Sequence, residues 1–326
     1  MIFRPFETWV ILILENFLET VIANNEKGGS LMGKLNFGPL MTAVVTPFDD
    51  DLQVDMTGFE RVIEHLLATG TTALVISGAT GESPTLNSME NLKLWEAAMD
   101  YADGKVPVVV GVGTNNTKTT LANIKLAEEV DVDALLVVVP YYNKPSQKGL
   151  LEHFSKIAKA TELPIILYNI PSRCGVGLEL KTILELAKLP NIIGIKDSTG
   201  NTEIITQLKQ KLGDDFLLYS GDDELYLETL KIGGNGVISV ASHLVGKSMK
   251  RIYELYNIGF DERAECLNVK ITPFYQAIFT SPNPAPIKSL LTKKGIDVGG
   301  VRLPLVSLED FEADILWDKV KDLIDK

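Results

Sequence analysis

The segment IIGIK, residues 192–196, is an almost wholly apolar run that ends in a lysine. A short run rich in β-branched residues is typical of a buried strand. Seven more runs of this kind occur from Pro39 onward, spaced ~30 residues apart, which is the length of one strand-and-helix unit. The expected strands cover residues 40–45, 73–77, 108–112, 134–139, 165–168, 192–196, 216–220 and 237–240.

Between these runs the spacing of apolar residues changes to three and four, which predicts amphipathic helices. Phe59, Val62, Ile63 and Leu66, followed by Gly70, form one example. Strands that are apolar throughout and joined by helices indicate a parallel sheet covered on its outside. Eight such units within about 205 residues fit one (β/α)8 TIM barrel of the α/β class better than a doubly wound sheet.

After Val240 the strand signals stop and helical patterns continue to the end of the chain. The last of these patterns begins at a predicted capping box formed by Ser307 and Asp310. We therefore expect a barrel in residues 32–243 and a C-terminal helical appendage in residues 244–326.

Residues 1–31 are expected to be a non-native N-terminal extension. The codons for residues 27–29 can read AAAGGAGG, a bacterial ribosome-binding site, so translation would start at Met32. An amphipathic N-terminal helix is the alternative.

The apolar run from Trp9 to Leu14 is too short for a membrane helix, and no cleavage site of a signal peptide follows it. We expect a cytoplasmic protein with no membrane partner.

The composition is that of a soluble globular protein, with 45% hydrophobic and 23% charged residues among 326. The net charge is -12, and no Lys/Arg cluster with interleaved aromatics is present, so nucleic acid is not expected as a partner. Cys174 and Cys266 are far apart in sequence and lack metal-ligand spacing, which indicates reduced thiols without a disulfide.

The histidines argue against two enzyme classes. His65, His153 and His243 form no pair with metal-ligand spacing, which disfavours a metal-dependent aldolase and a Ser-His-Asp hydrolase. No metal site is expected. A nicotinamide enzyme is also disfavoured, because no GxGxxG motif follows the first strand.

Lys196 is the strongest candidate for chemistry. An ammonium group among isoleucines is poorly solvated, so its pKa falls and part of it becomes the free amine, which can form an imine with a ketone. The alternative is an ordinary surface lysine just past the end of a strand. In a barrel the site lies where strands end in loops, and every unusual segment lies there. These segments are GATGES (78–83), PYYNKPS (140–146), YNIPSRCG (168–175), SGDD (220–223) and GVISV (236–240).

Together these segments resemble the dihydrodipicolinate synthase family, within the N-acetylneuraminate lyase superfamily of class I aldolases. The resemblance runs from about Leu35 to Leu308. It implies a lyase that condenses pyruvate with L-aspartate 4-semialdehyde to 4-hydroxy-tetrahydrodipicolinate, in the biosynthesis of diaminopimelate and lysine. It also implies no cofactor, because the imine on Lys196 itself serves as the electron sink.

The resemblance assigns roles residue by residue. Lys196 would form the Schiff base with pyruvate, and Tyr168 would shuttle protons during its formation. Thr80 and adjacent backbone amides, in the turn that includes Ala79, would hold the pyruvate carboxylate, since a Gly-flanked turn lets the chain approach an anion closely. Arg173 would bind the semialdehyde carboxylate with its planar fork.

The remaining assignments concern the pocket wall and the assembly. Gly221 would leave space in the pocket, and Ile238 would supply an apolar wall. Tyr142 resembles the tyrosine that reaches into the neighbouring subunit's site, which implies a homotetramer built as a dimer of dimers. Without the resemblance, Tyr142 reads equally well as a loop aromatic that covers the barrel mouth.

Ala79 departs from the family pattern, which has a threonine here whose hydroxyl bridges the two tyrosines in a proton relay. Alanine can neither donate nor accept a hydrogen bond. An ordered water could fill the gap, Ser77 could supply a hydroxyl, or the activity could be low or altered. Ser77 is the weaker replacement, because it lies on the other side of Gly78.

A second departure concerns regulation. Family members inhibited by lysine carry histidines and a glutamate where this chain has Ser88, Asn91 and Thr119. We therefore expect weak or absent inhibition by lysine, although Ser83, Asn115 and Tyr141 remain.

Two alternatives to the main interpretation stay open. One is another pyruvate-dependent aldolase of the superfamily, such as N-acetylneuraminate lyase or a 2-keto-3-deoxy-sugar acid aldolase, which Arg173 disfavours. The other is a non-catalytic barrel that acts as a binding protein, an alternative that Ala79 keeps open.

Overall fold

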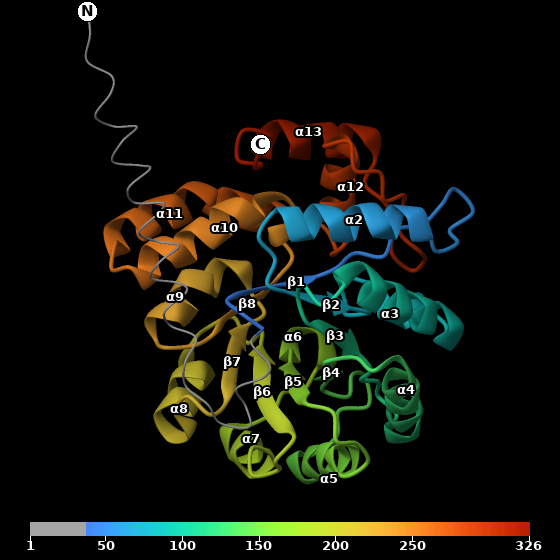
Figure 1. Ribbon diagram of the computed structural model, residues 1–326, viewed down its shortest axis with the longest axis vertical. Helices are drawn as coiled ribbons and strands as arrows, with labels where there is room; N and C mark the ends of the chain where they lie inside the picture. Colours follow the sequence, from blue (N-terminus) through green and yellow to red (C-terminus); the bar gives the residue numbers. More distant parts are fainter. Residues whose placement is uncertain (1–36) are drawn as a thin grey trace, which may run out of the picture. The chain divides into compact units, whose positions relative to one another are not determined.

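The computed structural model describes residues 37–326, and in these residues eight parallel strands close into a ring (Figure 1). The strands pair in chain order, and the last returns to the first, with Leu40 opposite Val237. They are β1 (Leu40–Ala43), β2 (Ala73–Ile76), β3 (Val108–Gly111), β4 (Ala134–Val138), β5 (Ile165–Asn169), β6 (Ile192–Asp197), β7 (Leu217–Ser220) and β8 (Gly236–Ser239).

All eight predicted strands are present, and each end lies within two residues of its predicted place. Helices and 3-10 turns follow these strands in the chain, and in Figure 1 most of the helices surround the ring, whereas α6 lies inside its outline. They are α2 (Met56–Ala68), η1 (Ser83–Thr85), α3 (Ser88–Ala102), α4 (Thr117–Val130), α5 (Gln147–Ala158), α6 (Pro171–Cys174), α7 (Leu180–Leu186), α8 (Glu203–Leu212), η2 (Asp223–Leu225), α9 (Tyr226–Lys231) and α10 (Ser242–Asn257). The predicted (β/α)8 TIM barrel is confirmed.

Burial on both faces explains why the strands are apolar throughout. Val109 of β3 and Ile166 of β5 are fully buried, as are Phe59 and Val62 on the inner face of α2. Each such side chain contributes roughly 1.5–3 kcal/mol when it is fully removed from water. The barrel interior and the helix layer therefore form one continuous core.

The C-terminal helices continue from the eighth barrel helix, α10, which packs against β1 and α2. After it come α11 (Asp261–Ala277), α12 (Ala285–Lys293) and α13 (Asp310–Val320), and these lie together on one side of the barrel (Figure 1). The predicted helical appendage is confirmed. The boundary expected at residue 243 stays a prediction, and it falls in the first turn of α10.

The predicted start of the last helix was wrong by two residues. The Glu312 carboxylate accepts the backbone N–H of Glu309, 3.0 Å away, so the capping box begins at Glu309. Ser307 lies before it, outside any helix or strand. No helix within residues 37–326 is long and apolar enough to cross a membrane. The expectations for residues 1–31 and for a start at Met32 lie outside the described residues.

Candidate active site

Lys196 lies near the carboxyl end of β6, between Tyr168 of β5 and Tyr219 of β7 in the strand register. Its side chain is buried, with 6% of the residue exposed. Its Nζ lies 4.4 Å from the centroid of the Tyr168 ring. The structure thus brings together the amine and the tyrosine that the sequence singled out.

Burial sets the protonation of this pair. It lowers the pKa of the Lys196 ammonium to about 8, although the carboxylates of Asp222 and Asp223 act in the opposite direction. One pH unit below such a pKa, about a tenth of the amine is free. Burial also raises the pKa of the Tyr168 phenol to about 12, so this hydroxyl keeps its proton at neutral pH. The site therefore holds a nucleophile and a proton donor side by side.

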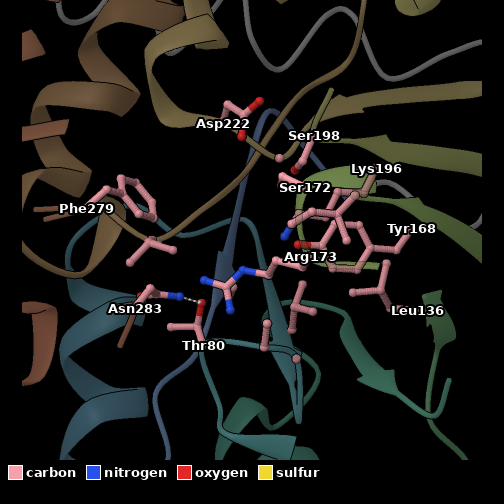
Figure 2. A pocket seen from close by; sticks show the side chains of 17 residues that line it. Thr80, Leu136, Tyr168, Ser172, Arg173, Lys196, Ser198, Asp222, Phe279 and Asn283 are labelled. Carbon is pink, nitrogen blue, oxygen red and sulfur yellow. Dashed lines mark hydrogen bonds between the residues drawn. The ribbon is translucent and has the colours of Figure 1, made fainter. Parts of the chain in front are cut away.

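A cavity of about 180 Å³ opens over Lys196 at the carboxyl ends of the strands (Figure 2). Six of the predicted site residues line it, namely Ala79, Thr80, Tyr168, Arg173, Lys196 and Gly221. The sequence reasoning missed five other polar or aromatic residues of the lining, Ser172, Ser198, Asp222, Phe279 and Asn283. The cavity is small, partly open and charged, which suits a compact anion.

Two predicted site residues lie elsewhere. Ile238 is fully buried in β8 and does not line this cavity, whereas Val240, two residues later, does. Tyr142 is 88% exposed, does not line the cavity, and adopts a left-handed backbone with φ of 74°. A left-handed tyrosine is conformationally costly, so the loop holds this side chain outward at some expense in free energy.

Gly221 lets the loop after β7 pass directly against the lysine. A Cβ at this position would lie 2.7 Å from Cε of Lys196 and 1.9 Å from Oγ of Ser198. Any side chain would therefore displace the amine. That Gly221 leaves space in the pocket for a substrate stays a prediction.

Thr80 is oriented by a residue from the C-terminal region. Nδ2 of Asn283 donates to Oγ1 of Thr80 over 2.9 Å, and both side chains are buried (Figure 2). In that bond the Thr80 hydroxyl is the acceptor, and within residues 37–326 it donates to no other side chain. This hydrogen can therefore be donated to an anion in the cavity. Only the fold could reveal Asn283, because it lies 203 residues from Thr80 and in no recognisable motif.

The turn that carries Thr80 is anchored by a buried ion pair. Glu82, in the same turn, lies 3.1 Å from Nζ of Lys288 on α12, and the two side chains are 0% and 2% exposed. Lys288 also donates to the carbonyls of Thr46, at 2.8 Å, and of Gly300. Burial lowers the pKa of Lys288 to about 8, which the Glu82 carboxylate partly offsets.

Arg302 extends this anchor. Its backbone N–H donates to the Glu82 carboxylate over 2.9 Å, and its guanidinium pairs with Glu90 of α3 over 2.7 Å. The hydroxyl of Thr46 donates to the carbonyl of Gly81 over 2.7 Å. Through these contacts with Glu82, the C-terminal region holds the GATGES turn in position. We refer to Glu82, Lys288 and Arg302 as the turn anchor.

Asn169 fixes the conformation of the segment YNIPSRCG. It is fully buried, donates to Oδ1 of Asp197 over 2.8 Å, and accepts the backbone N–H of Leu178 over 2.9 Å. These bonds close the loop that contains the short helix α6, and α6 places Arg173 on the cavity wall. Cys174 is buried and donates to the carbonyl of Val139, so it packs rather than reacts.

A second cavity, of about 280 Å³, adjoins the first. Ala79, Tyr168 and Arg173 are among the residues that line both. Ser77 lines only the second, and its Oγ accepts the indole N–H of Trp95 over 2.9 Å. A longer side chain at position 79 would extend into the space where the two cavities meet.

Within the part of the chain that the structure describes, no group of three or more His, Cys, Asp or Glu side chains could hold a metal ion. Both cysteines are free thiols.

Comparison with known proteins gives a consistent assignment. Residues 36–323 match the dihydrodipicolinate synthetase family. The chain is 44% identical over 290 residues to the 4-hydroxy-tetrahydrodipicolinate synthase of Bacillus subtilis (strain 168), covering 89% of this chain and 100% of that protein. It is 46% identical over 283 residues to the protein of the same name from Ligilactobacillus salivarius (strain UCC118), covering 86% and 97%.

A solved structure agrees with this. The dihydrodipicolinate synthase of Bacillus anthracis superposes with a TM-score of 0.86 at 40% identity, covering 88% of this chain and 98% of that chain. Because the family model spans nearly the whole described chain and the relatives are at least 40% identical over most of it, the protein belongs to the dihydrodipicolinate synthetase family.

Proposed function

We propose that this protein is a 4-hydroxy-tetrahydrodipicolinate synthase, which condenses pyruvate with L-aspartate 4-semialdehyde. The observation that carries the proposal is the buried amine of Lys196, 4.4 Å from the Tyr168 ring, in a cavity that also presents Arg173 and Thr80. The curated relatives, 44% and 46% identical over most of the chain, bear the same name. The reaction belongs to the biosynthesis of diaminopimelate and lysine.

The chemistry begins at Lys196. Its free amine attacks the pyruvate carbonyl, and loss of water gives an iminium. The iminium withdraws electrons from the adjacent methyl group, which loses a proton to give an enamine. The enamine carbon then forms a bond to the aldehyde carbon of the second substrate, which restores the iminium, and the aldehyde oxygen takes up a proton. The amino group of the semialdehyde portion, after losing a proton, attacks the iminium carbon, and the bond from that carbon to the Lys196 nitrogen breaks. This closes the ring of the product and returns the free lysine. No bound cofactor is required, because the imine itself accepts the electron pair.

The cavity residues assist these steps. Tyr168, with its pKa raised to about 12 by burial, gives a proton to the departing hydroxyl and takes it back from water or substrate. The free hydroxyl hydrogen of Thr80 binds the pyruvate carboxylate. Arg173 binds the carboxylate of the semialdehyde with two parallel hydrogen bonds. Gly221 keeps the approach to the amine open.

The assembly forms part of the proposal. Tyr142 is 88% exposed and held in a left-handed conformation outside its own cavity. We infer that it reaches the site of a neighbouring subunit, so that the enzyme is a homotetramer made of two tight dimers. Weak or absent inhibition by lysine also stays a prediction.

Two alternatives are less well supported. The sugar-acid aldolases share the lysine and the tyrosine, but the names of the relatives and the cationic Arg173 in the lining favour the synthase. A non-catalytic barrel is disfavoured by the names of the relatives and by the buried amine of Lys196, which lines an open cavity 4.4 Å from the Tyr168 ring.

A coupled assay with pyruvate and L-aspartate 4-semialdehyde, run beside sialic acid and ketodeoxygluconate, tests the function. Turnover is expected only with the first pair. Borohydride reduction in the presence of pyruvate should add one pyruvate-derived group, found on Lys196 by peptide mass analysis. Turnover of a sugar acid in preference to the semialdehyde would overturn the proposal, and an absent adduct would favour a binding protein.

The rate of pyruvate trapping should depend on pH through the Lys196 amine. Only the unprotonated amine attacks, so the rate should rise about tenfold per pH unit below the pKa and level off above about pH 8. Reductive trapping with cyanoborohydride between about pH 6 and about pH 10 measures this. A rate that continues to rise toward the ordinary lysine pKa of 10.5 would show that burial does not activate the amine.

Replacing Ala79 with threonine should raise the turnover number at least several-fold. The hydroxyl would enter the space between the two cavities, where it can pass a proton to or from Tyr168. Steady-state kinetics of Ala79→Thr beside Ala79→Val, which has the same shape but no hydroxyl, separates proton transfer from volume. An unchanged rate in the threonine variant would show that the relay is completed by another group.

A further inference from the structure

Recognition of the second substrate requires a partner for its ammonium group, a question that rests on the proposed function. L-Aspartate 4-semialdehyde carries a carboxylate and an ammonium on the same carbon. Arg173 accounts for the carboxylate. An ammonium enclosed in the same small cavity loses part of its hydration, which is unfavourable unless an acceptor replaces the water.

Asp222 contributes the one carboxylate among the described residues that line this cavity. Neighbouring acids are already engaged. Asp197 accepts from Asn169 and Thr199, while Asp223 accepts from Ser239 and two backbone amides. Both of these side chains are buried and neither lines the cavity.

The Asp222 carboxylate retains free acceptor positions. The ion pairs found within residues 37–326 do not include it. The backbone amide of Gly200 donates to it, which occupies one of about four lone-pair positions. Burial raises its pKa, and the cation on Lys196 opposes this rise, as a substrate ammonium would.

The loop holds Asp222 in place. Its backbone N–H donates to Oγ of Ser220 over 3.0 Å, and that hydroxyl donates back to the Asp222 carbonyl over 3.0 Å. Gly221, immediately before it, lies against Lys196. In Figure 2, Asp222 lies above Lys196 and Arg173, and Thr80 lies below them. The acid and the arginine are therefore separate binding groups around the reacting amine.

We propose that Asp222 binds the α-ammonium group of L-aspartate 4-semialdehyde and so selects an amino-acid aldehyde over one that lacks the amine. Arg173 and Asp222 then form a charge pair matched to the zwitterionic end of the substrate. An aldehyde without the amine, such as succinic semialdehyde, makes the arginine contact alone.

The test compares the two aldehydes in Asp222→Asn. The carboxamide keeps the size of the side chain and removes the charge. We expect kcat/KM for L-aspartate 4-semialdehyde to fall about 10- to 100-fold, the usual effect of a hydrogen bond between charged groups. The inhibition constant of succinic semialdehyde and the KM for pyruvate should change by less than about threefold. Glu224→Gln, an exposed carboxylate two residues later, is the matched control and should leave all three constants unchanged.

The outcomes are distinguishable. If Asp222→Asn weakens both aldehydes equally, or slows pyruvate trapping, Asp222 acts on the lysine or its iminium and the inference is wrong. An unchanged kcat/KM for the semialdehyde would also refute it. Normal pyruvate trapping by the unsubstituted protein without any turnover of L-aspartate 4-semialdehyde would instead overturn the proposed function, and this inference with it.

Discussion

Lys196→Arg is expected to lower kcat for the condensation by at least on the order of 10⁴-fold. A guanidinium stays protonated at every accessible pH, so it offers no lone pair to a ketone. Its larger head would also press on Gly221, which already lies against the lysine side chain. The measurement is steady-state turnover together with borohydride trapping, and the arginine variant should show no pyruvate adduct.

Two controls make this result interpretable. Lys196→Met keeps the length of the side chain without a charge, and it should be equally inactive if the missing amine is the cause. Lys188→Arg changes an exposed lysine paired with Glu185, and it should keep full turnover. Substantial activity in the arginine variant would place the imine-forming amine elsewhere in the chain.

Lys288→Met should lower the free energy of unfolding by about 3–5 kcal/mol. The change leaves the Glu82 carboxylate buried, without its cation and with one fewer hydrogen bond. It also removes the donor to the carbonyls of Thr46 and Gly300. Urea unfolding followed by circular dichroism measures the loss.

The same helix provides a control. Lys293→Met removes an ion pair with Asp314 that is largely exposed, and it should cost no more than about 1 kcal/mol. Adding Glu82→Gln to Lys288→Met should restore part of the stability, because no unpaired charge then remains buried. Equal losses in the two lysine variants would mean that the turn anchor contributes little to stability.

The sequence was sufficient to predict the barrel because its strands are buried on both faces. A run such as residues 108–112 is apolar throughout, and few other structures accommodate it. Helix α12 was harder to foresee, since Pro284 and Pro286 at its start resemble a loop. The last capping box was misplaced because serine is a preferred N-cap residue and glutamate is not, and only the backbone shows that the helix begins after Glu309.

The site could be predicted in part for a similar reason. Lys196, Tyr168 and Arg173 lie in short segments with distinctive local order, so their chemistry could be inferred before their positions were known. Asn283 and Lys288 could not, because each meets its partner across more than 200 residues of chain. Tertiary contacts of this length leave no periodicity in a single sequence. Asp222 lay in a recognised segment, but only the cavity shows that its carboxylate is unpaired.

The turn anchor has a consequence for engineering. Every strand of the barrel precedes residue 240, yet the turn that contains Thr80 is tied to Lys288 and Arg302. The barrel is therefore not a transferable module. In a chimaera that joins this barrel to the C-terminal helices of a homologue, the turn that contains Thr80 would be held by residues of the homologue. Such a chimaera would stay active only where those helices supply cations that can pair with Glu82.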